Sequence, residues 1–330
     1  MPNVVGMATT FNTPNFVGEL YTIGKVDTPF LSAIGGLTGG KVVYSKGFEW
    51  QDVDLRAASS HRQRLEGAPA PTAQERARYN ERNVVEIHHE TVSVSWTRLA
   101  DIMGHSALSL VGGNNPIQDE EAFQIKIALL QIARDVEDSL INSTFAEPAD
   151  NLTPRRTRGL LDAITTNIWD AHGQPLTAGM VLGLAQMAWE NGGLRDTETR
   201  TLMGGISAIR RVVDLFVPQN AVIQNRMVGG VNLQTIESPM GNFNLMADQM
   251  VPTGTLAAAD LSQCSPCHLL IPERPNRPGG FMFITPLGLS GSSDDSQIYG
   301  EVGLEYGQES RHGKIVDFTT QYDSITGSGS

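Results

Sequence analysis

The sequence predicts an α+β fold with long extensions outside its compact parts. Three features predict it: one long helical pattern, two β-patterns that flank a polar stretch of 32 residues, and a later segment in which helices and strands alternate. Hydrophobic residues make up 40% of the 330 residues, aromatic residues only 6%, and there are 34 glycines. The composition therefore favours a loop-rich protein with a modest core over a disordered chain.

Charge and cysteine content exclude several classes of protein. The formal net charge is -12, whereas a dedicated nucleic-acid-binding protein would carry a basic excess. No run of eighteen apolar residues is present, so we expect no membrane span. Residues 1–19 lack the basic start and the continuous apolar stretch of a signal peptide. Two cysteines are too few for a disulfide scaffold and fit a reducing compartment.

The first forty residues carry little charge, and their glycines and Pro29 interrupt any periodicity. This predicts an extended arm over residues 1–40, with at most a short helix around residues 16–23. A strand is expected over residues 41–50, where β-branched and aromatic residues are frequent.

The stretch over residues 51–82 carries six arginines and five acidic residues but few large apolar ones. Alternating apolar residues resume at residues 92–96, so two strands flank this excursion. Structureless loops longer than about 12–15 residues are uncommon in compact domains. Such a loop is either disordered or ordered by something outside its domain, and mixed charges suit contact with another copy of the same surface. We therefore expect inter-subunit contacts from Arg56, Arg62, Arg64, Glu66, Glu75, Arg76, Arg78 and Arg82.

A long helix is predicted over residues 116–145. Asn115 can cap its N-terminus, Pro116 suits its first turn, and three acidic residues follow. Apolar residues then recur at spacings of three and four, as one buried face requires. At about 1.5 Å per residue the helix would be roughly 45 Å long, which indicates a spine that crosses the molecule.

The chain then alternates between helices and strands, which predicts an α/β subdomain. Helices are expected over residues 177–190 and 207–216. Strands are expected over residues 201–205, 268–271, 281–284 and 315–319, with a strand or loop over residues 241–250.

One short motif could carry chemistry. Cys264-Ser265-Pro266-Cys267-His268 matches the pattern that attaches c-type haem, with two thiols for the thioether bonds and a histidine as axial ligand. Haem attachment normally needs export, a redox disulfide usually lies in a thioredoxin-like βαβ unit, and a zinc site needs further ligands. A proline-containing turn before a strand explains the motif more simply, so we expect no cofactor, no metal and no catalytic residue.

Several short segments, spread along most of the chain, carry a resemblance through their order and spacing. They are Asp27-Thr28-Pro29-Phe30, Phe48-Glu49-Trp50 with Leu55, Glu66-Gly67, Val92-Ser93-Val94-Ser95, Ala133-Arg134-Asp135-Val136-Glu137, Arg156-Thr157-Arg158-Gly159-Leu160, residues 298–304 and His312-Gly313-Lys314-Ile315. Together they resemble the major capsid proteins of tailed double-stranded DNA phages. The resemblance is to the branch of the Hong Kong 97 type, within a capsid family formerly labelled a domain of unknown function.

The resemblance implies the Hong Kong 97-like capsid fold, which has four parts. They would be an N-terminal arm (1–40), an extended E-loop hairpin (41–96), a peripheral domain with the spine helix (97–165 and 278–325) and an α/β axial domain (166–277), followed by a flexible tail (326–330).

The resemblance also implies a structural, non-enzymatic protein that self-assembles into hexamers and pentamers of an icosahedral shell around packaged double-stranded DNA. Its partners would be copies of itself, a scaffold, a portal and decoration proteins, and the genome would be enclosed without specific binding. It would be assembled in the host cytoplasm and reside in the virion. Two alternatives stay open: a redox or haem protein built on the cysteine motif, and a cellular encapsulin-like shell.

Overall fold

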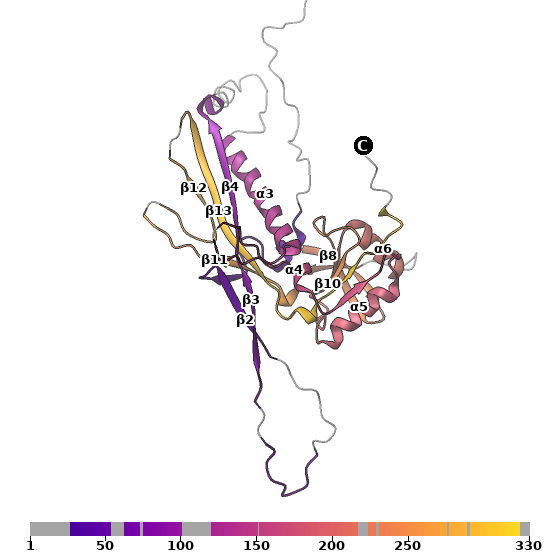
Figure 1. Cartoon of the computed structure of the whole chain (residues 1–330). Coiled ribbons are helices and arrows are strands. Elements are labelled where there is room, and N and C mark those ends of the chain that lie inside the picture. The colour runs from indigo at the N-terminus through magenta and orange to yellow at the C-terminus, as the bar shows by residue number, and fades with distance from the viewer. Residues whose placement is uncertain are drawn as a thin grey trace, which may run out of the picture. The chain divides into compact units, whose positions relative to one another are not determined.

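The computed structural model describes most of the chain (Figure 1). The chain divides into two compact units. The described residues are 27–53, 63–72, 75–100, 120–150, 152–216, 224–228, 231–275, 277–288 and 291–323. The described part of the first unit comprises residues 89–100, 120–132, 284–288 and 291–298, and the second unit comprises the other described residues. The elements β4 (Glu86–Ser95), α3 (Glu120–Asn142), β12 (Met282–Pro286) and β13 (Ser293–Glu305) contribute residues to both units.

The predicted long helix is confirmed as α3, which ends at Asn142 and not at Phe145. It begins at Glu120 among the described residues, and residues 116–119 lie outside them. Its 23 residues give a length of about 35 Å. Ile132, Val136 and Leu140 share one face and are at most 2% exposed, as their spacing predicts.

The largest sheet has seven strands in the order β5-β14-β10-β6-β9-β8-β7 and belongs to the second unit. Helices α5 (Ala178–Glu190) and α6 (Ile206–Phe216), both predicted from the sequence, pack against it and enclose a hydrophobic core. Thr177 caps α5 by accepting a hydrogen bond from the backbone N–H of Met180. The strands are β5 (Ile168–Asp170), β6 (Arg200–Gly204), β7 (Gln224–Val228), β8 (Val231–Ser238), β9 (Gly241–Ala247), β10 (Leu256–Asp260) and β14 (Gly313–Val316).

A second sheet joins β1 (Lys41–Val43), β11 (Ser265–Leu269), β13 and β12 in that order, and β4 pairs with β13. Strand β1 runs parallel to β11, which is antiparallel to β13. Among the described residues, short α-helices include α1 (Pro29–Ile34) and α4 (Leu160–Ala163), and residues 96–100 are also helical. The 3-10 helices η2 (Leu261–Gln263) and η3 (Glu309–Arg311) are also present.

Strands β2 (Gly47–Val53) and β3 (Arg78–Val84) form a separate two-stranded ribbon. The sequence predicts one strand over residues 41–50, but a bend at residues 44–46 separates β1 from β2. The predicted flanking strand, residues 92–96, falls largely in β4 and pairs with β13 instead. The sequence does not predict strand β3, because a strand in a ribbon with one exposed face can be polar and need not alternate apolar with polar residues.

Two further strands join sheets that the sequence does not predict. Strand β11, expected within the α/β segment, pairs with β1 and β13. Strand β14, expected in the sheet of the peripheral part, lies between β10 and β5 in the seven-stranded sheet. Consecutive strands are often neighbours, but these two pair with segments distant in sequence, which periodicity does not reveal.

Helix α1 lies in the segment that the sequence predicts to be extended, and the helix expected around residues 16–23 lies outside the described chain. The side chain of Glu137 on α3 accepts hydrogen bonds from the backbone N–H groups of Phe30 (2.8 Å) and Leu31 (2.6 Å). The first N–H groups of any helix lack partners within the helix. A carboxyl group from α3 therefore caps α1 and ties the two helices together.

Glu137 is completely buried and also forms a side-chain hydrogen bond with Asp248, which is 1% exposed and follows β9. Burial and then the charge of Asp248 raise the pKa of Glu137 to about 9. Two carboxyl groups this close do not both ionise readily, so the pair shares a proton at neutral pH. This proton stabilises the junction of α1, α3 and the segment after β9.

We predict that the subunit loses stability as the pH rises from about 5 to about 9. The unfolded chain releases the Glu137 proton near the ordinary pKa of 4.5, whereas the folded pair keeps it up to about 9. Unfolding in this window therefore releases a proton, and the free energy of unfolding should fall by up to about 1.4 kcal/mol per pH unit. In Asp248→Asn the amide can donate to Glu137 in place of the shared proton, so the slope should shrink.

Chemical denaturation of the unassembled subunit at several pH values measures this slope. Glu190→Gln removes an exposed carboxyl group from α5 and is the matched control, which should keep the parent's slope. Equal slopes for the parent and Asp248→Asn would contradict the prediction.

Candidate functional site

The ribbon of β2 and β3 has two faces with different roles. Residues directly opposite each other share a face, and exposure alternates along β2, so one face is exposed and the other is half-buried. Polar side chains join the strands across the exposed face. These contacts are Arg82 to Glu49 (2.8 Å), Asn80 to Glu49 (3.3 Å) and Arg78 to Gln51 (3.2 Å).

The half-buried face anchors the root of the ribbon, the end near Gly47 and Val84, through aromatic side chains. Trp50 donates from Nε1 to the carbonyl of Gly307 at 2.9 Å, and its ring meets the Tyr306 ring edge-on with centroids 4.9 Å apart. Phe48 lies against Gly303 of β13, where an added Cβ would come within 2.9 Å of the ring. The glycine therefore leaves room for the ribbon to approach β13 closely.

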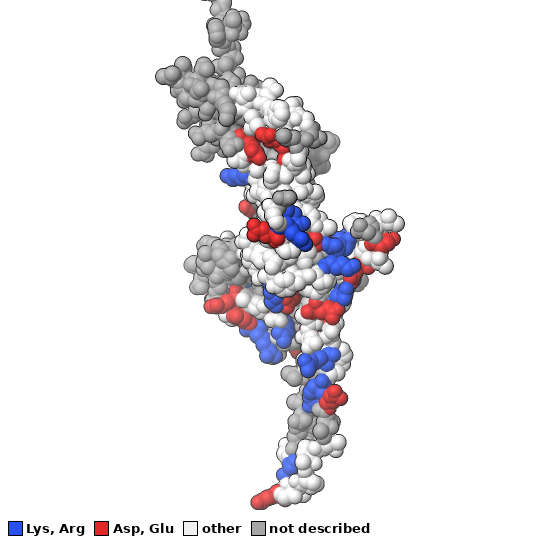
Figure 2. Space-filling view, turned by 90° about the vertical axis from the view of Figure 1, so that its left-hand side faces the viewer, with Lys and Arg blue, Asp and Glu red and all other residues white. Residues whose placement is uncertain are grey.

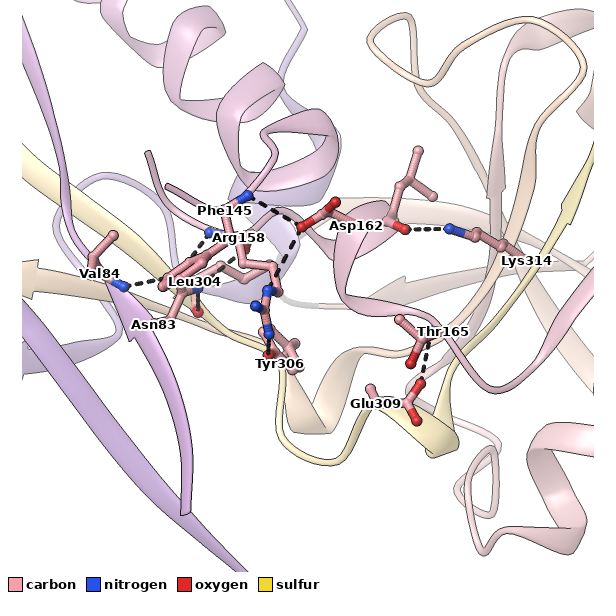
Figure 3. Close-up of polar contacts among 11 residues, drawn as sticks. Asn83, Val84, Phe145, Arg158, Asp162, Thr165, Leu304, Tyr306, Glu309 and Lys314 are labelled. Carbon is pink, nitrogen blue, oxygen red and sulfur yellow. Dashed lines mark hydrogen bonds and ion pairs between the residues drawn. The ribbon is translucent and has the colours of Figure 1, made fainter. Parts of the chain in front are cut away.

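The Asn83 side chain lies at the same root, is completely buried and uses every hydrogen-bonding position of its amide (Figure 3). Nδ2 donates to the carbonyls of Leu304 (2.6 Å) and Arg158 (3.1 Å). Oδ1 accepts from the backbone N–H groups of Val84 (2.8 Å) and Arg158 (2.7 Å). An amide offers two donors and two acceptor positions, so this one is saturated. It binds β3 to β13 and to the segment that precedes α4.

Arg158 extends this network toward α4 (Figure 3). Its guanidinium lies 4.6 Å from the centre of the Phe145 ring, donates to the Tyr306 hydroxyl at 3.2 Å and lies 3.7 Å from the Asp162 carboxylate. Asp162 also accepts the backbone N–H of Phe145 at 3.2 Å. Lys314 of β14 donates to the carbonyl of Leu161 at 2.6 Å. The ribbon root is thus linked through α4 to the seven-stranded sheet.

Arg82, a predicted inter-subunit contact, is bound within its own subunit. It holds Glu147 with two parallel bonds, Nη2 to Oε1 at 2.6 Å and Nε to Oε2 at 2.9 Å, besides its contact with Glu49. The hydrogen bonds with Glu147 and then Glu49 raise the pKa of Arg82, and the bond to Arg82 lowers the pKa of Glu147. Sequence reasoning missed Glu147 because it lies 65 residues further along the chain.

Most other predicted contact residues lie on the loop beyond the ribbon. Residues 63–72 and 75–77 are exposed, Leu65 is 86% exposed, and Figure 2 shows both signs of charge along this extension. Arg56 and Arg62 lie outside the described residues. The predicted residues that form no hydrogen bond or ion pair with another described residue are Arg64, Glu66, Glu75 and Arg76.

A groove with a volume of about 410 Å³ lies beside the root of the ribbon. Residues between 147 and 156 form one side of it, and Lys46, Glu86 and Ile87 contribute the rest. Burial raises the pKa of Glu86, whose carboxylate accepts the backbone N–H of Thr157 at 3.3 Å. The sequence does not predict this groove, because it combines three segments that are distant along the chain.

The cysteine motif is a buried part of the second sheet and of the turn before it. Cys264 and Cys267 are free and at most 5% exposed. Burial raises the pKa of both thiols, to about 12 for Cys267, so neither is poised as a nucleophile or ligand. Cys267 and His268 are neighbours in β11, so their side chains point to opposite faces. Within the described residues no group of three or more His, Cys, Asp or Glu side chains could hold a metal ion.

Solved structures with a similar fold come from phage capsids and a related shell. The chain aligns with the capsid of cyanophage A-1(L) at a TM-score of 0.66 and 12% identity, over 95% of this chain and 99% of that one. A structure from Mycobacterium phage Bobi aligns at 0.57 and 13%, over 95% and 97%. The SrpI encapsulin of Synechococcus elongatus PCC 7942 aligns at 0.56 and 12%, over 92% and 94%. These likenesses confirm the predicted α+β fold of the Hong Kong 97 type.

A family match in the sequence bears on the choice between a capsid protein and an encapsulin. No individual curated protein matches the chain. A family model described as the SU10 major capsid protein matches residues 3–319, which is nearly the whole chain. The match confirms the expected structural role in a capsid and does not favour the encapsulin-like alternative. The chain belongs to the SU10 major capsid protein family.

Proposed function

We propose that this capsid protein forms hexamers and pentamers that close an icosahedral shell around packaged double-stranded DNA, and that the loop of each subunit lies on a neighbour. The family supplies the structural role and the assembly from copies of itself. Assembly in the host cytoplasm, the absence of enzymatic activity and the division into arm, E-loop, peripheral and axial parts belong to the same proposal.

The contrast between the root and the far end of the ribbon carries this proposal. At the root, aromatic contacts and the saturated Asn83 amide fix β2 and β3 to the subunit. At the far end, charged and apolar side chains of residues 63–72 are exposed. A firmly held element with an unpaired end is suited to reach a second molecule, since little ordering entropy is then lost on contact.

The genome and the accessory proteins complete the proposed assembly. With a net charge of -12, the subunit encloses DNA and does not neutralise its phosphates, so any binding to duplex DNA should be weak and should fade with salt. A scaffold, a portal and decoration proteins are the further partners that such a shell uses. Among the described helices, none is long and apolar enough to cross a membrane.

We predict that replacing Arg62, Arg64, Arg76 and Arg78 together by alanine leaves the subunit folded but impairs assembly. Exposed ion pairs contribute only about 0–1 kcal/mol, so thermal unfolding and circular dichroism should match the parent. Partly desolvated Arg–carboxylate pairs at a subunit contact are stronger, and the same contact recurs in every copy. Negative-stain microscopy and sedimentation should show fewer particles, or particles that dissociate as salt rises.

Arg82→Ala is the control for the four-arginine variant. It removes an arginine from the same ribbon, but one that holds Glu147 and Glu49 within the subunit. Because Arg82 holds Glu147 with two parallel bonds, its loss should lower the thermal stability of the unassembled subunit slightly, which the four-arginine variant should not do. Normal assembly of the four-arginine variant at every salt concentration would show that the loop arginines do not hold the shell together.

A second prediction concerns the thiols. Changing both Cys264 and Cys267 to alanine should leave particle yield and shape unchanged, because buried thiols with raised pKa values act as small apolar groups. The parent should also lack the Soret band of a haem protein. If the double variant stays folded yet forms no particles, the cysteines have a role in assembly that their burial does not reveal.

A further inference from the structure

The groove beside the ribbon root carries charged side chains that make no direct ion pair within the described subunit. Glu147 is bound to the ribbon arginine, and Arg155 to a buried glutamate on β13. The charge of Lys46 acts on Glu147 and that of Arg156 on Glu86. Neither exposed cationic side chain forms a direct hydrogen bond or ion pair with another described residue. Asp150 accepts only a backbone N–H two residues away, at 3.4 Å, among its described neighbours.

Apolar surface lies beside these charges. Leu152 is 90% exposed and Ile87 is 47% exposed, and both line the groove together with Pro148 and Pro154. Covering an exposed leucine removes apolar surface from water and therefore favours contact. Single exposed apolar residues are common on protein surfaces. Leu152 and Ile87, however, lie in a groove that is also lined by cations. Apolar surface with charged residues around it is typical of a binding surface with a polar rim.

The loop of the ribbon carries the matching groups in three consecutive residues. Arg64, Leu65 and Glu66 provide one cation, one apolar side chain and one anion, all exposed. The groove offers an anion at Asp150, apolar surface at Leu152 and cations beyond them. The two surfaces are therefore complementary in charge and in hydrophobicity.

The loop of the same subunit does not fill this groove. The groove lies at the root of the ribbon, next to Lys46 and Glu147. Strand β2 has seven residues and spans about 20 Å from that root to Val53. Figure 1 shows the described loop continuing beyond the ribbon in the same direction, away from the root. Any loop in the groove must come from another copy of the chain.

We propose that the groove receives residues 63–72 of a neighbouring copy of this chain, with Leu65 against Leu152 and Glu66 facing Lys46 and Arg156. This rests on the proposed function, because it assigns the surface on which the neighbour's loop lies. Each subunit would then carry one loop and one groove, so the contact is head-to-tail and closes into a ring when the rotation between copies allows.

Cross-linking tests the juxtaposition directly. Leu65→Cys and Leu152→Cys are introduced together in a background where Cys264 and Cys267 are alanine, and assembled particles are treated with a short bifunctional maleimide. The double variant should give a ladder of covalent oligomers, and a mixture of the two single variants should give dimers. Leu65→Cys combined with Ile206→Cys, which is 72% exposed on α6, is the matched control and should give neither.

Charge reversal tests the pairing. Glu66→Arg and Arg156→Glu should each reduce particle yield at least several-fold, and the variant with both reversals should recover most of it. Glu190→Arg and Arg195→Glu make the same charge changes at exposed positions outside the loop and the groove and should assemble normally. Circular dichroism of each unassembled variant shows that the fold is retained.

The possible failures are distinguishable. If the parent chain forms no capsomers or shells under any condition, the proposed function fails. If the parent assembles, but the Leu65–Leu152 variant gives no cross-link in intact particles or both single charge reversals assemble normally, the groove is not the site of the neighbour's loop and only this inference is overturned.

Discussion

The four hydrogen bonds of the buried Asn83 amide fix the ribbon to the rest of its unit. A ribbon of two strands is at best marginally stable alone, so its position depends on what holds its root. Each bond contributes about 0.5–1.5 kcal/mol, but losing the amide would also leave backbone groups of Arg158 and Leu304 buried without partners, at about 1–3 kcal/mol each. Because the backbone groups come from β3, β13 and the segment before α4, one side chain fixes three segments at once.

Charged residues near the root of the ribbon and those on its loop differ in their partners. Arg82 is committed to Glu49 and Glu147 within the subunit, whereas Arg64 and Glu66 on the loop have no partner among the described residues. Charges exposed to solvent stabilise a single subunit very little. They matter where a second surface removes water from them. In the proposed assembly, the same kind of residue serves the fold near the root and the contact with a neighbouring copy at the far end.

Residue patterns predict those elements whose stability is local. The spacing of apolar residues on α3 is visible in the sequence, and α3, α5 and α6 lie where the residue patterns predict helices. Pairing between distant segments is different. The pairing of β14 with β5 and the contact of Glu147 with Arg82 have no signature in the local sequence. Each pair of partners is distant along the chain and meets only in the folded structure. The exposed charged loop is predictable because it has few large apolar residues. Which of its arginines is paired within the subunit is not predictable.

In the second unit, several buried polar side chains form hydrogen bonds between segments that are distant along the chain. Besides Asn83 and Glu137, His312 is fully buried, accepts the backbone N–H of Asp260 at Nδ1 (3.2 Å) and donates from Nε2 to the carbonyl of Tyr306 (2.8 Å). Burial lowers the pKa of His312, which favours the neutral ring that these two bonds require. Apolar packing is nearly non-directional, whereas such bonds fix distances and angles. A subunit of a closed shell repeats any error in orientation at every copy. A chain with 6% aromatic residues and a modest core gains that precision from buried amide, carboxyl and imidazole groups, and among them the Asn83 amide fixes the ribbon within its unit.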